Sequence, residues 1–251
     1  MKLILITRPD FFPGEAALIN ALFRAGLERL HLRKPGASSE ELAEWLMEID
    51  PSFRHLIVLH DHHELALDYH LGGVHLNSRN PKISSGIQAY KASAEGFTIS
   101  RSCHSLGEVE EALAPHFSSI EESEPVGLNF QSSHSLEKDG SYSSPSSLSS
   151  EVLDEVFSGS FSFDYVFLSP IFNSISKPGY NAAFTQEQLL QAAASPAFSQ
   201  KVYALGGVSA ENLPQVSRMG FAGAVLLGDV WQAPSPVQRF SQLLEKIGIL
   251  L

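Results

Sequence analysis

Basic side chains follow several short apolar segments of this otherwise acidic sequence. Arg33 and Lys34 come directly after one such segment, Arg101 lies just after another, and Lys177 follows a third by a few residues. The whole chain holds 17 basic and 28 acidic residues, which gives a formal net charge of −11. Cations gathered at equivalent places in an anionic chain indicate a local site for an anionic ligand.

Glycines follow two later apolar segments. Gly206 and Gly207 come after segment 202–205, and Gly228 comes after segment 224–227. Glycine leaves its backbone N–H open to a ligand, and barrel enzymes commonly hold a phosphate after strands seven and eight. We therefore expect Gly206, Gly207 and Gly228 to contact a phosphate group.

Eight short segments rich in Val, Ile and Leu must position these residues. They are apolar on both faces, which is typical of parallel strands covered on both sides: 3–6, 29–32, 56–59, 73–76, 97–100, 165–168, 202–205 and 224–227. Amphipathic segments between them predict helices, at 15–25, 38–49, 106–113, 185–194, 210–219 and 236–247. This alternation predicts a (β/α)8 TIM barrel. A doubly wound sheet is the main competitor, but its Gly-rich first turn has no counterpart here.

The composition narrows the class of protein further. The single cysteine, Cys103, excludes an internal disulfide and suits a reducing compartment. No apolar run approaches the roughly 18 residues of a membrane helix, and Arg8, Pro9 and Asp10 follow the first apolar run too soon for a signal peptide. The acidic charge argues against nucleic-acid binding. We expect one cytoplasmic domain over residues 1–251, without nucleic-acid or membrane partners.

One segment does not fit a minimal barrel. Serine makes up 16 of the 46 residues from 118 to 163. Such a composition buries too little apolar surface to offset the entropy lost on ordering. We interpret it as a partly irregular insertion between the fifth and sixth strands, and as a surface extension rather than a binding lid.

Several histidines and the cysteine invite a metal or a nucleophilic role. His60, His62 and His63 lie on a strand-to-helix turn, where their side chains should diverge, so we do not expect a zinc site. His75 is expected to be a hydrogen-bonded residue inside the barrel. Cys103 is expected to be a packed thiol rather than a nucleophile.

The segments at the strand ends resemble the thiamine phosphate synthase/TenI superfamily of barrels. The resemblance covers seven of the eight strand ends in the right order, through HLRK at 31–34, LHDHHELAL at 59–67, GVHL at 73–76, SRSCHS at 100–105, DYVFLSPIFNSISKPGY at 164–180, ALGGVSAENL at 204–213 and GFAGAVLLGD at 220–229.

The resemblance implies a transferase that joins a hydroxymethylpyrimidine diphosphate to a thiazole phosphate, releases pyrophosphate and forms thiamine phosphate. Its main demand is electrostatic stabilisation of the leaving pyrophosphate, which the family meets with cationic side chains and Mg²⁺. The matching positions fall into three groups. Arg33, Ser102, His104 and Lys177 match the catalytic and diphosphate side; His31, Ser174, Ser176, Gly206, Gly207 and Gly228 match the substrate and phosphate side; Asp61 matches a magnesium ligand.

The departures from the family pattern concern the diphosphate and the metal. Pro35 stands where the family has a diphosphate-binding lysine, and Lys34 is displaced from that position by one residue. Asn80 stands where the family has a second metal-binding aspartate, and Arg79 adds positive charge beside it. Because Mg²⁺ is usually held through one or two carboxylates, we expect a weakened magnesium site.

Two alternative functions remain open. A TenI-type thiazole tautomerase needs an acid–base group rather than a diphosphate clamp, and His31 with the Arg101–Ser105 segment fits that subgroup. However, Pro170 and Lys34 stand where that subgroup has a histidine and a glutamate. A non-catalytic thiazole-phosphate-binding regulator needs the phosphate site alone. The expected partners are small phosphorylated pyrimidines and thiazoles, and a homodimer is the candidate assembly.

Overall fold

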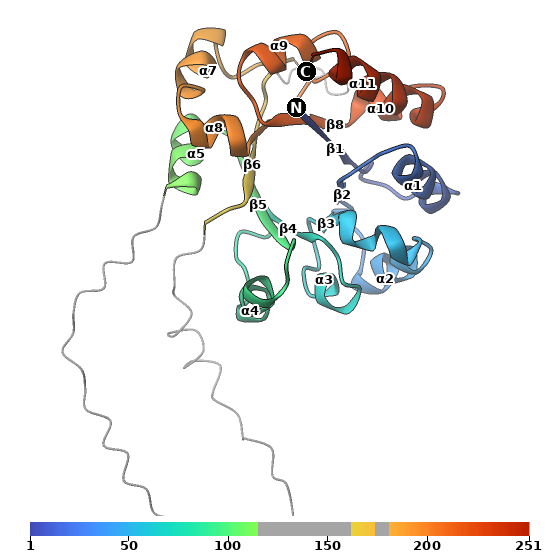
Figure 1. The fold of residues 1–251 in the computed structure, drawn as a ribbon. Helices are drawn as coiled ribbons and strands as arrows, with labels where there is room; N and C mark the ends of the chain where they lie inside the picture. Colours follow the sequence, from blue (N-terminus) through green and yellow to red (C-terminus); the bar gives the residue numbers. More distant parts are fainter. Residues whose placement is uncertain (115–161, 174–180, 251) are drawn as a thin grey trace, which may run out of the picture. The chain divides into compact units, whose positions relative to one another are not determined.

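The computed structural model describes residues 1–114, 162–173 and 181–250. Eight parallel strands close into one barrel in the order of the sequence, with helices around the outside (Figure 1). The predicted (β/α)8 barrel is thereby confirmed. The strands are β1 (Lys2–Ile6), β2 (Leu30–Leu32), β3 (Ile57–Leu59), β4 (Gly73–Leu76), β5 (Thr98–Cys103), β6 (Tyr165–Leu168), β7 (Val202–Ala204) and β8 (Gly223–Leu226).

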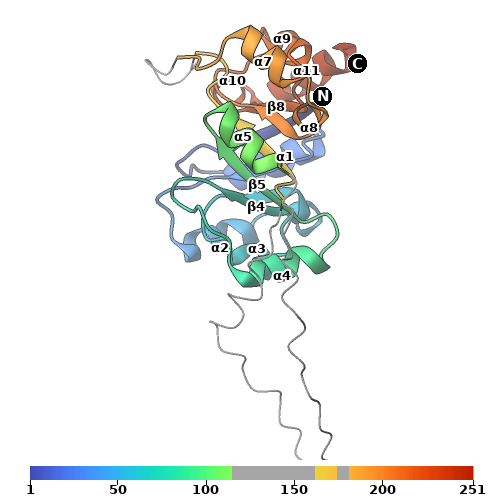
Figure 2. The same ribbon diagram turned by 90° about the vertical axis from the view of Figure 1, so that its left-hand side faces the viewer.

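The outer layer is made of amphipathic helices, most of which begin at a residue able to cap them. These are α1 (Glu15–Arg24), α2 (Ser39–Met47), η1 (Pro51–Leu56), α3 (Leu65–Asp68), α4 (Ser85–Ser93), α5 (Leu106–Leu113), α7 (Gln186–Ala192), α8 (Pro196–Lys201), α9 (Leu213–Arg218), α10 (Gly228–Trp231) and α11 (Pro236–Leu250). Helix α2 begins with a capping box, in which the Ser38 hydroxyl accepts from the Glu41 N–H and the Glu41 carboxylate accepts from the Ser38 N–H. Among the described residues, no helix is long and apolar enough to cross a membrane. Figure 2 shows the same molecule from the side.

Strand β5 is longer than the sequence suggested. The expected strand ended at Ser100, whereas β5 runs to Cys103 and pairs residue by residue with β6, from Ser100 opposite Tyr165 to Cys103 opposite Leu168. The polar residues Ser100 and Ser102 face the barrel interior and bond to His75 there. A strand whose inward face is polar lacks the apolar signature by which buried strands are recognised.

The barrel interior has an apolar part and a polar part. Strands β6, β7, β8 and β1 supply the apolar cluster, which consists of Ile4, Ile6, Tyr165, Phe167, Tyr203 and Val225. Strands β2 to β5 supply inward-facing histidines and serines instead, and the phenol of Tyr165 reaches them from β6. Burying polar groups is costly unless each has a hydrogen-bond partner, so this part of the interior must be bonded internally.

Two of the remaining expectations concern the insertion and the cysteine. Of the predicted insertion 118–163, residues 118–161 lie outside the described residues, while Phe163 is buried at 8% exposure directly before β6. Phe163 therefore belongs to the barrel and not to an extension. Cys103 is fully buried, and burial raises the pKa of its thiol to about 12. The expected packed thiol is confirmed, because a thiol with so high a pKa is not a nucleophile at neutral pH.

Candidate active site at the carboxyl ends of the strands

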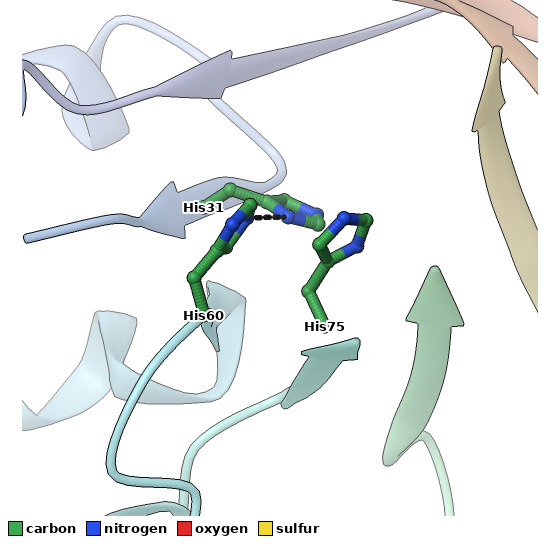
Figure 3. Close-up of side chains that lie close together, drawn as sticks. All are labelled: His31, His60 and His75. Carbon is green, nitrogen blue, oxygen red and sulfur yellow. Dashed lines mark hydrogen bonds between the residues drawn. The ribbon is translucent and has the colours of Figure 1, made fainter. Parts of the chain in front are cut away.

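Three histidines from adjacent strands meet inside the barrel. His31 on β2, His60 after β3 and His75 on β4 are 0%, 4% and 0% exposed, and their rings point toward one another (Figure 3). The Nδ1 atom of His31 lies 2.9 Å from Nε2 of His60, and Nε2 of His31 lies 2.8 Å from the Tyr165 hydroxyl. The rings of His60 and His75 stack at 4.2 Å. We call these three residues the histidine cluster.

His75 holds two serines of β5 in place. Its Nδ1 lies 2.8 Å from the Ser100 hydroxyl, and its Nε2 lies 2.9 Å from the Ser102 hydroxyl. The expectation that His75 is a hydrogen-bonded barrel residue is confirmed. Ser102 is half-buried near the mouth of the barrel, so His75 fixes the position of a hydroxyl that the resemblance places near pyrophosphate.

The histidine cluster is uncharged at neutral pH. Burial is the main cause that lowers the pKa of all three rings, to about 3 for His75 and well below the usual value for His31 and His60. Neighbouring positive groups add to the effect, since Arg29 acts on His31 and Arg33 acts on His60. Neutral imidazoles are acceptors or donors of single hydrogen bonds, and not cations that could bind an anion.

One nitrogen from each ring of the histidine cluster lies within 4.8 Å of the others, which is close enough for a shared metal ion. However, both ring nitrogens of His31 and of His75 already have hydrogen-bond partners. The arginines that lower the pKa values also oppose a divalent cation by charge repulsion. We therefore interpret the cluster as a hydrogen-bonded interior rather than as a metal site.

These contacts correct one residue assignment. The resemblance suggested that His31 binds substrate. A side chain that has no exposed surface, and whose two nitrogens are both bonded inside the protein, is not in contact with a ligand at the mouth. His31 faces inward from the middle of β2, one layer below the residues that follow the strands.

Arg33, in contrast, lies where a ligand can reach it. It follows β2 and is half-buried, and its backbone is fixed to the end of β1: the Arg33 N–H donates to the Thr7 hydroxyl, and that hydroxyl donates back to the Arg33 carbonyl. Burial and the nearby Arg79 lower the pKa of Arg33, while Asp61 raises it. Arg33 therefore lies close to both Arg79 and Asp61 at the ends of three neighbouring strands.

Lys34 does not add to the positive charge of this region. Its ammonium group donates to both carboxylate oxygens of Glu15, at 2.7 and 2.8 Å, and to the Asp10 carbonyl at 2.8 Å. Both side chains of the pair are only 1% exposed. The sequence placed Lys34 among the cations for an anionic ligand, and this expectation is corrected: its three protons are committed inside the protein and its charge is matched by Glu15.

Asp61 is surrounded by hydrogen-bond donors. Its Oδ1 accepts from Nη2 and Nε of Arg79, at 3.0 and 3.3 Å, and from Nδ2 of Asn80 at 2.8 Å; its Oδ2 accepts from Arg79 Nη2 at 3.1 Å. The Asn80 amide nitrogen also donates to the His60 carbonyl, so two acceptors fix this orientation of the amide.

This donor set does not fit a magnesium ion. Mg²⁺ requires oxygen ligands in a near-octahedral arrangement. At Asp61, the second ligand position presents an N–H group in place of a carboxylate oxygen, and a guanidinium already supplies the positive charge. We derive no magnesium-dependent step for this chain.

His104 bridges the loops after β5 and β6. Its Nδ1 lies 3.2 Å from the Ser169 carbonyl oxygen and 3.3 Å from the Ser169 hydroxyl. Its backbone N–H donates to Glu108 in the first turn of α5. With Ser102 it lines a cavity of about 270 Å³. The substrate contact and the structural role weighed for His104 are thus both compatible with its position.

The paired glycines are required by the backbone itself. Gly206 and Gly207 have φ angles of 94° and 62°, and a Cβ on Gly207 would lie 2.2 Å from the Asn173 carbonyl oxygen. The loops after β6 and β7 therefore approach too closely for any side chain here. This packing explains both glycines, and their contact with a phosphate stays a prediction.

Gly228 begins the short helix α10, next to an ion pair. Arg239 of α11 donates to both carboxylate oxygens of Asp229, at 2.7 and 3.0 Å. The Asp229 side chain is only 8% exposed, so its role is to anchor α11 to α10. The predicted contact of Gly228 with a phosphate is not tested by this arrangement. Ser174, Ser176 and Lys177 lie outside the described residues, and their predicted roles also stay predictions.

Sequence reasoning missed two arrangements. The histidine cluster was overlooked because its members lie on different strands, although each follows the inward-facing alternation of its strand. The Glu15–Lys34 pair joins the start of α1 to the end of β2, which no local pattern reveals. A buried glutamate in an otherwise apolar helix face was the signal available for it.

The fold and the site together define a (β/α)8 barrel of the kind that carries its polar and ionisable groups at the carboxyl ends of the strands. A family model described as thiamine monophosphate synthase matches residues 3–120 and 148–230. The chain belongs to the thiamine monophosphate synthase family, which confirms the resemblance seen in its strand ends.

Solved structures agree with this assignment. The thiamine phosphate pyrophosphorylase from Bacteroides thetaiotaomicron is 29% identical, with a TM-score of 0.67 over 99% of this chain and 98% of that chain. The thiamine phosphate pyrophosphorylase from Pyrococcus furiosus is 18% identical, with a TM-score of 0.64 over 100% of this chain and 96% of that chain, and shows the shared fold alone. No curated protein matches the sequence.

Proposed function

We propose that this chain is a thiamine phosphate synthase-like transferase, which joins hydroxymethylpyrimidine diphosphate to thiazole phosphate and releases pyrophosphate. The observation that carries the proposal is the family match, which spans the barrel from β1 to the start of α11's connection, at residues 3–120 and 148–230. It is supported by the position of Arg33, Ser102 and His104 at the carboxyl ends of neighbouring strands.

The side chains divide the work of such a reaction. Departure of pyrophosphate from the pyrimidine leaves a cationic carbon, so the leaving group needs positive charge and hydrogen-bond donors. Arg33 supplies a fixed guanidinium, because both its backbone N–H and its carbonyl are tied to Thr7. Ser102, held by His75, and His104, held by Ser169, are the polar groups on the opposite side of the mouth.

The test is a direct assay of product. The protein is incubated with hydroxymethylpyrimidine diphosphate and thiazole phosphate, and thiamine phosphate is measured against a heat-killed control. Formation of thiamine phosphate supports the proposal. Absence of product with both substrates at saturation, with or without Mg²⁺, contradicts it.

A thiazole tautomerase is a second candidate, favoured by the loss of the diphosphate-binding lysine and by the neutralisation of Lys34. Moving a proton on a thiazole carboxylate phosphate needs an acid–base group, for which His104 is suitably placed beside Ser169. Turnover of thiazole carboxylate phosphate, without formation of thiamine phosphate from the first pair of substrates, would select this reaction. Binding of thiazole phosphate with neither activity would select a regulator.

Replacement of Arg33 by alanine should weaken binding of inorganic pyrophosphate about tenfold or more, because a charge-assisted contact to the anion is lost. The fold should remain intact, since the backbone bonds between residue 33 and Thr7 use a hydroxyl and not the arginine side chain. Isothermal calorimetry measures the affinity, and circular dichroism checks the fold. Arg218→Ala, an exposed arginine at the end of α9, is the matched control. Unchanged affinity in Arg33→Ala would remove Arg33 from the site.

A further inference from the structure

The loop after β4 delivers a guanidinium to the carboxylate of Asp61. Arg79 contacts both oxygens of Asp61, at 3.0 and 3.1 Å through one nitrogen, and Asp61 is only 12% exposed. Arg79 itself keeps 39% of its side chain exposed. The contact therefore holds the guanidinium in place while part of it still faces solvent.

The loop that carries Arg79 is organised before any ligand arrives. The Asn77 side-chain oxygen accepts from the backbone N–H groups of Arg79 and Asn80, at 2.9 and 3.2 Å. The Asn77 and Asn80 amide nitrogens both donate to the His60 carbonyl, which fastens the loop to the end of β3. An Asx turn of this kind fixes the direction in which the next side chain leaves the loop.

The local charge balance is positive. Arg33 and Arg79 both lie close to Asp61, and the cavity of about 570 Å³ lined by Asp61 and Arg79 is also lined by Lys82. Lys34 does not contribute, because Glu15 neutralises it. One carboxylate is thus set against three cationic side chains, two of which are arginines that bind phosphate oxygens in a bidentate manner.

We propose that Arg79, held by Asp61, takes the place of a divalent metal in this chain, and that Arg79 and Arg33 together bind a diphosphate without magnesium. The inference deepens the proposed function, on which it rests for the chemical class of the ligand. Asp61 then acts as a positioning residue for Arg79 and is not a metal ligand. An arginine pair supplies positive charge and hydrogen-bond donors for the same oxygens that a metal ion would neutralise.

The experiment is calorimetry of inorganic pyrophosphate binding to the full chain, in EDTA and in Mg²⁺. We expect the affinity in EDTA to be within about threefold of the affinity in Mg²⁺. Arg79→Gln should lower the affinity in EDTA about tenfold or more, because a charge-assisted contact to the anion is lost. Arg218→Gln, a distant exposed arginine, is the matched control and should leave the affinity unchanged.

Asp61→Asn separates the two roles of the carboxylate. If Asp61 were a metal ligand, the amide would abolish any increase in affinity that Mg²⁺ brings. If Asp61 only positions Arg79, the substitution also removes a negative charge beside the anion, so the affinity in EDTA should fall by less than it does in Arg79→Gln.

Three results would overturn the inference: a loss of wild-type affinity of tenfold or more on replacing Mg²⁺ by EDTA, unchanged affinity in Arg79→Gln, or no pyrophosphate binding in either condition. The proposed function fails differently. Metal-free, Arg79-dependent binding of pyrophosphate without any thiamine phosphate product would leave the inference standing and reject the transferase. Product formed only with Mg²⁺ would do the reverse.

Discussion

Replacement of Lys34 by methionine should lower the free energy of unfolding by about 3–5 kcal/mol, because it leaves the Glu15 carboxylate buried without a counter-charge. The pair is 1% exposed on each side, and the ammonium group has no proton left for water: two contacts go to Glu15 and one goes to the Asp10 carbonyl. Burial already raises the pKa of Glu15, against the opposing effect of Lys34. Urea denaturation at pH 7 measures the change.

Two further variants make this experiment specific. The double variant Glu15→Leu with Lys34→Met should recover most of the loss, because an apolar pair of similar volume needs no hydrogen-bond partners. Arg24→Met is the matched control, since Arg24 forms an exposed ion pair with Asp50 at 3.8 Å and should cost less than about 1 kcal/mol. A single Lys34→Met variant within 1 kcal/mol of the wild type would mean that Glu15 finds another partner or becomes protonated at little cost.

Acidification from pH 7 to pH 5.5 should cost the fold about 4 kcal/mol through the histidine cluster alone. The pKa values of His31, His60 and His75 are lowered in the folded state, to about 3 for His75, whereas unfolded histidines titrate near 6.5. The unfolded chain therefore binds protons first. Stability is fully present above pH 6.5 and is lost as the pH falls from there toward the folded-state values, at up to about 1.4 kcal/mol per histidine and pH unit.

The slope of stability against pH identifies the groups responsible. Urea denaturation is measured between pH 7 and pH 5.5, a window above the range in which most carboxylates titrate. His75→Gln should remove about a third of the slope even if the variant is less stable at pH 7, because the slope counts protons and not contacts. His55→Gln, at an exposed position, should leave the slope unchanged. His63, whose pKa is also lowered by burial, adds to the slope in the same direction. A flat profile in the wild type would show that the cluster accepts protons in the folded state.

Much of the barrel could be predicted because its strands are apolar on both faces. All eight predicted strands are present, and their bounds agree to within one or two residues except in β5. Two features escaped the pattern. The inward residues Ser100 and Ser102 make β5 look like a loop, and helix α4, with Ile87 as its only buried residue, lacks an apolar stripe. Helix α4 begins at a serine cap that periodicity alone does not reveal.

The candidate site could be predicted as a set of positions but not as a set of charges. Arg33, Asp61, Ser102 and His104 all follow or end strands as expected, because parallel strands bring their carboxyl ends to one edge. Whether a cation is available is decided by contacts between distant segments, such as those of Lys34 with Glu15 and of Arg79 with Asp61. Such pairs depend on loop conformation, which the order of residues does not specify.

The histidine cluster also has a direction. Arg29, at the amino-terminal end of β2, hydrogen-bonds the Tyr165 phenol and can only donate. The phenol must therefore give its own proton to Nε2 of His31, and a neutral His31 then carries its single proton on Nδ1, facing Nε2 of His60. His60 in turn keeps its proton on Nδ1. A guanidinium at the closed end of the barrel thus selects the tautomer of a ring at the opposite end.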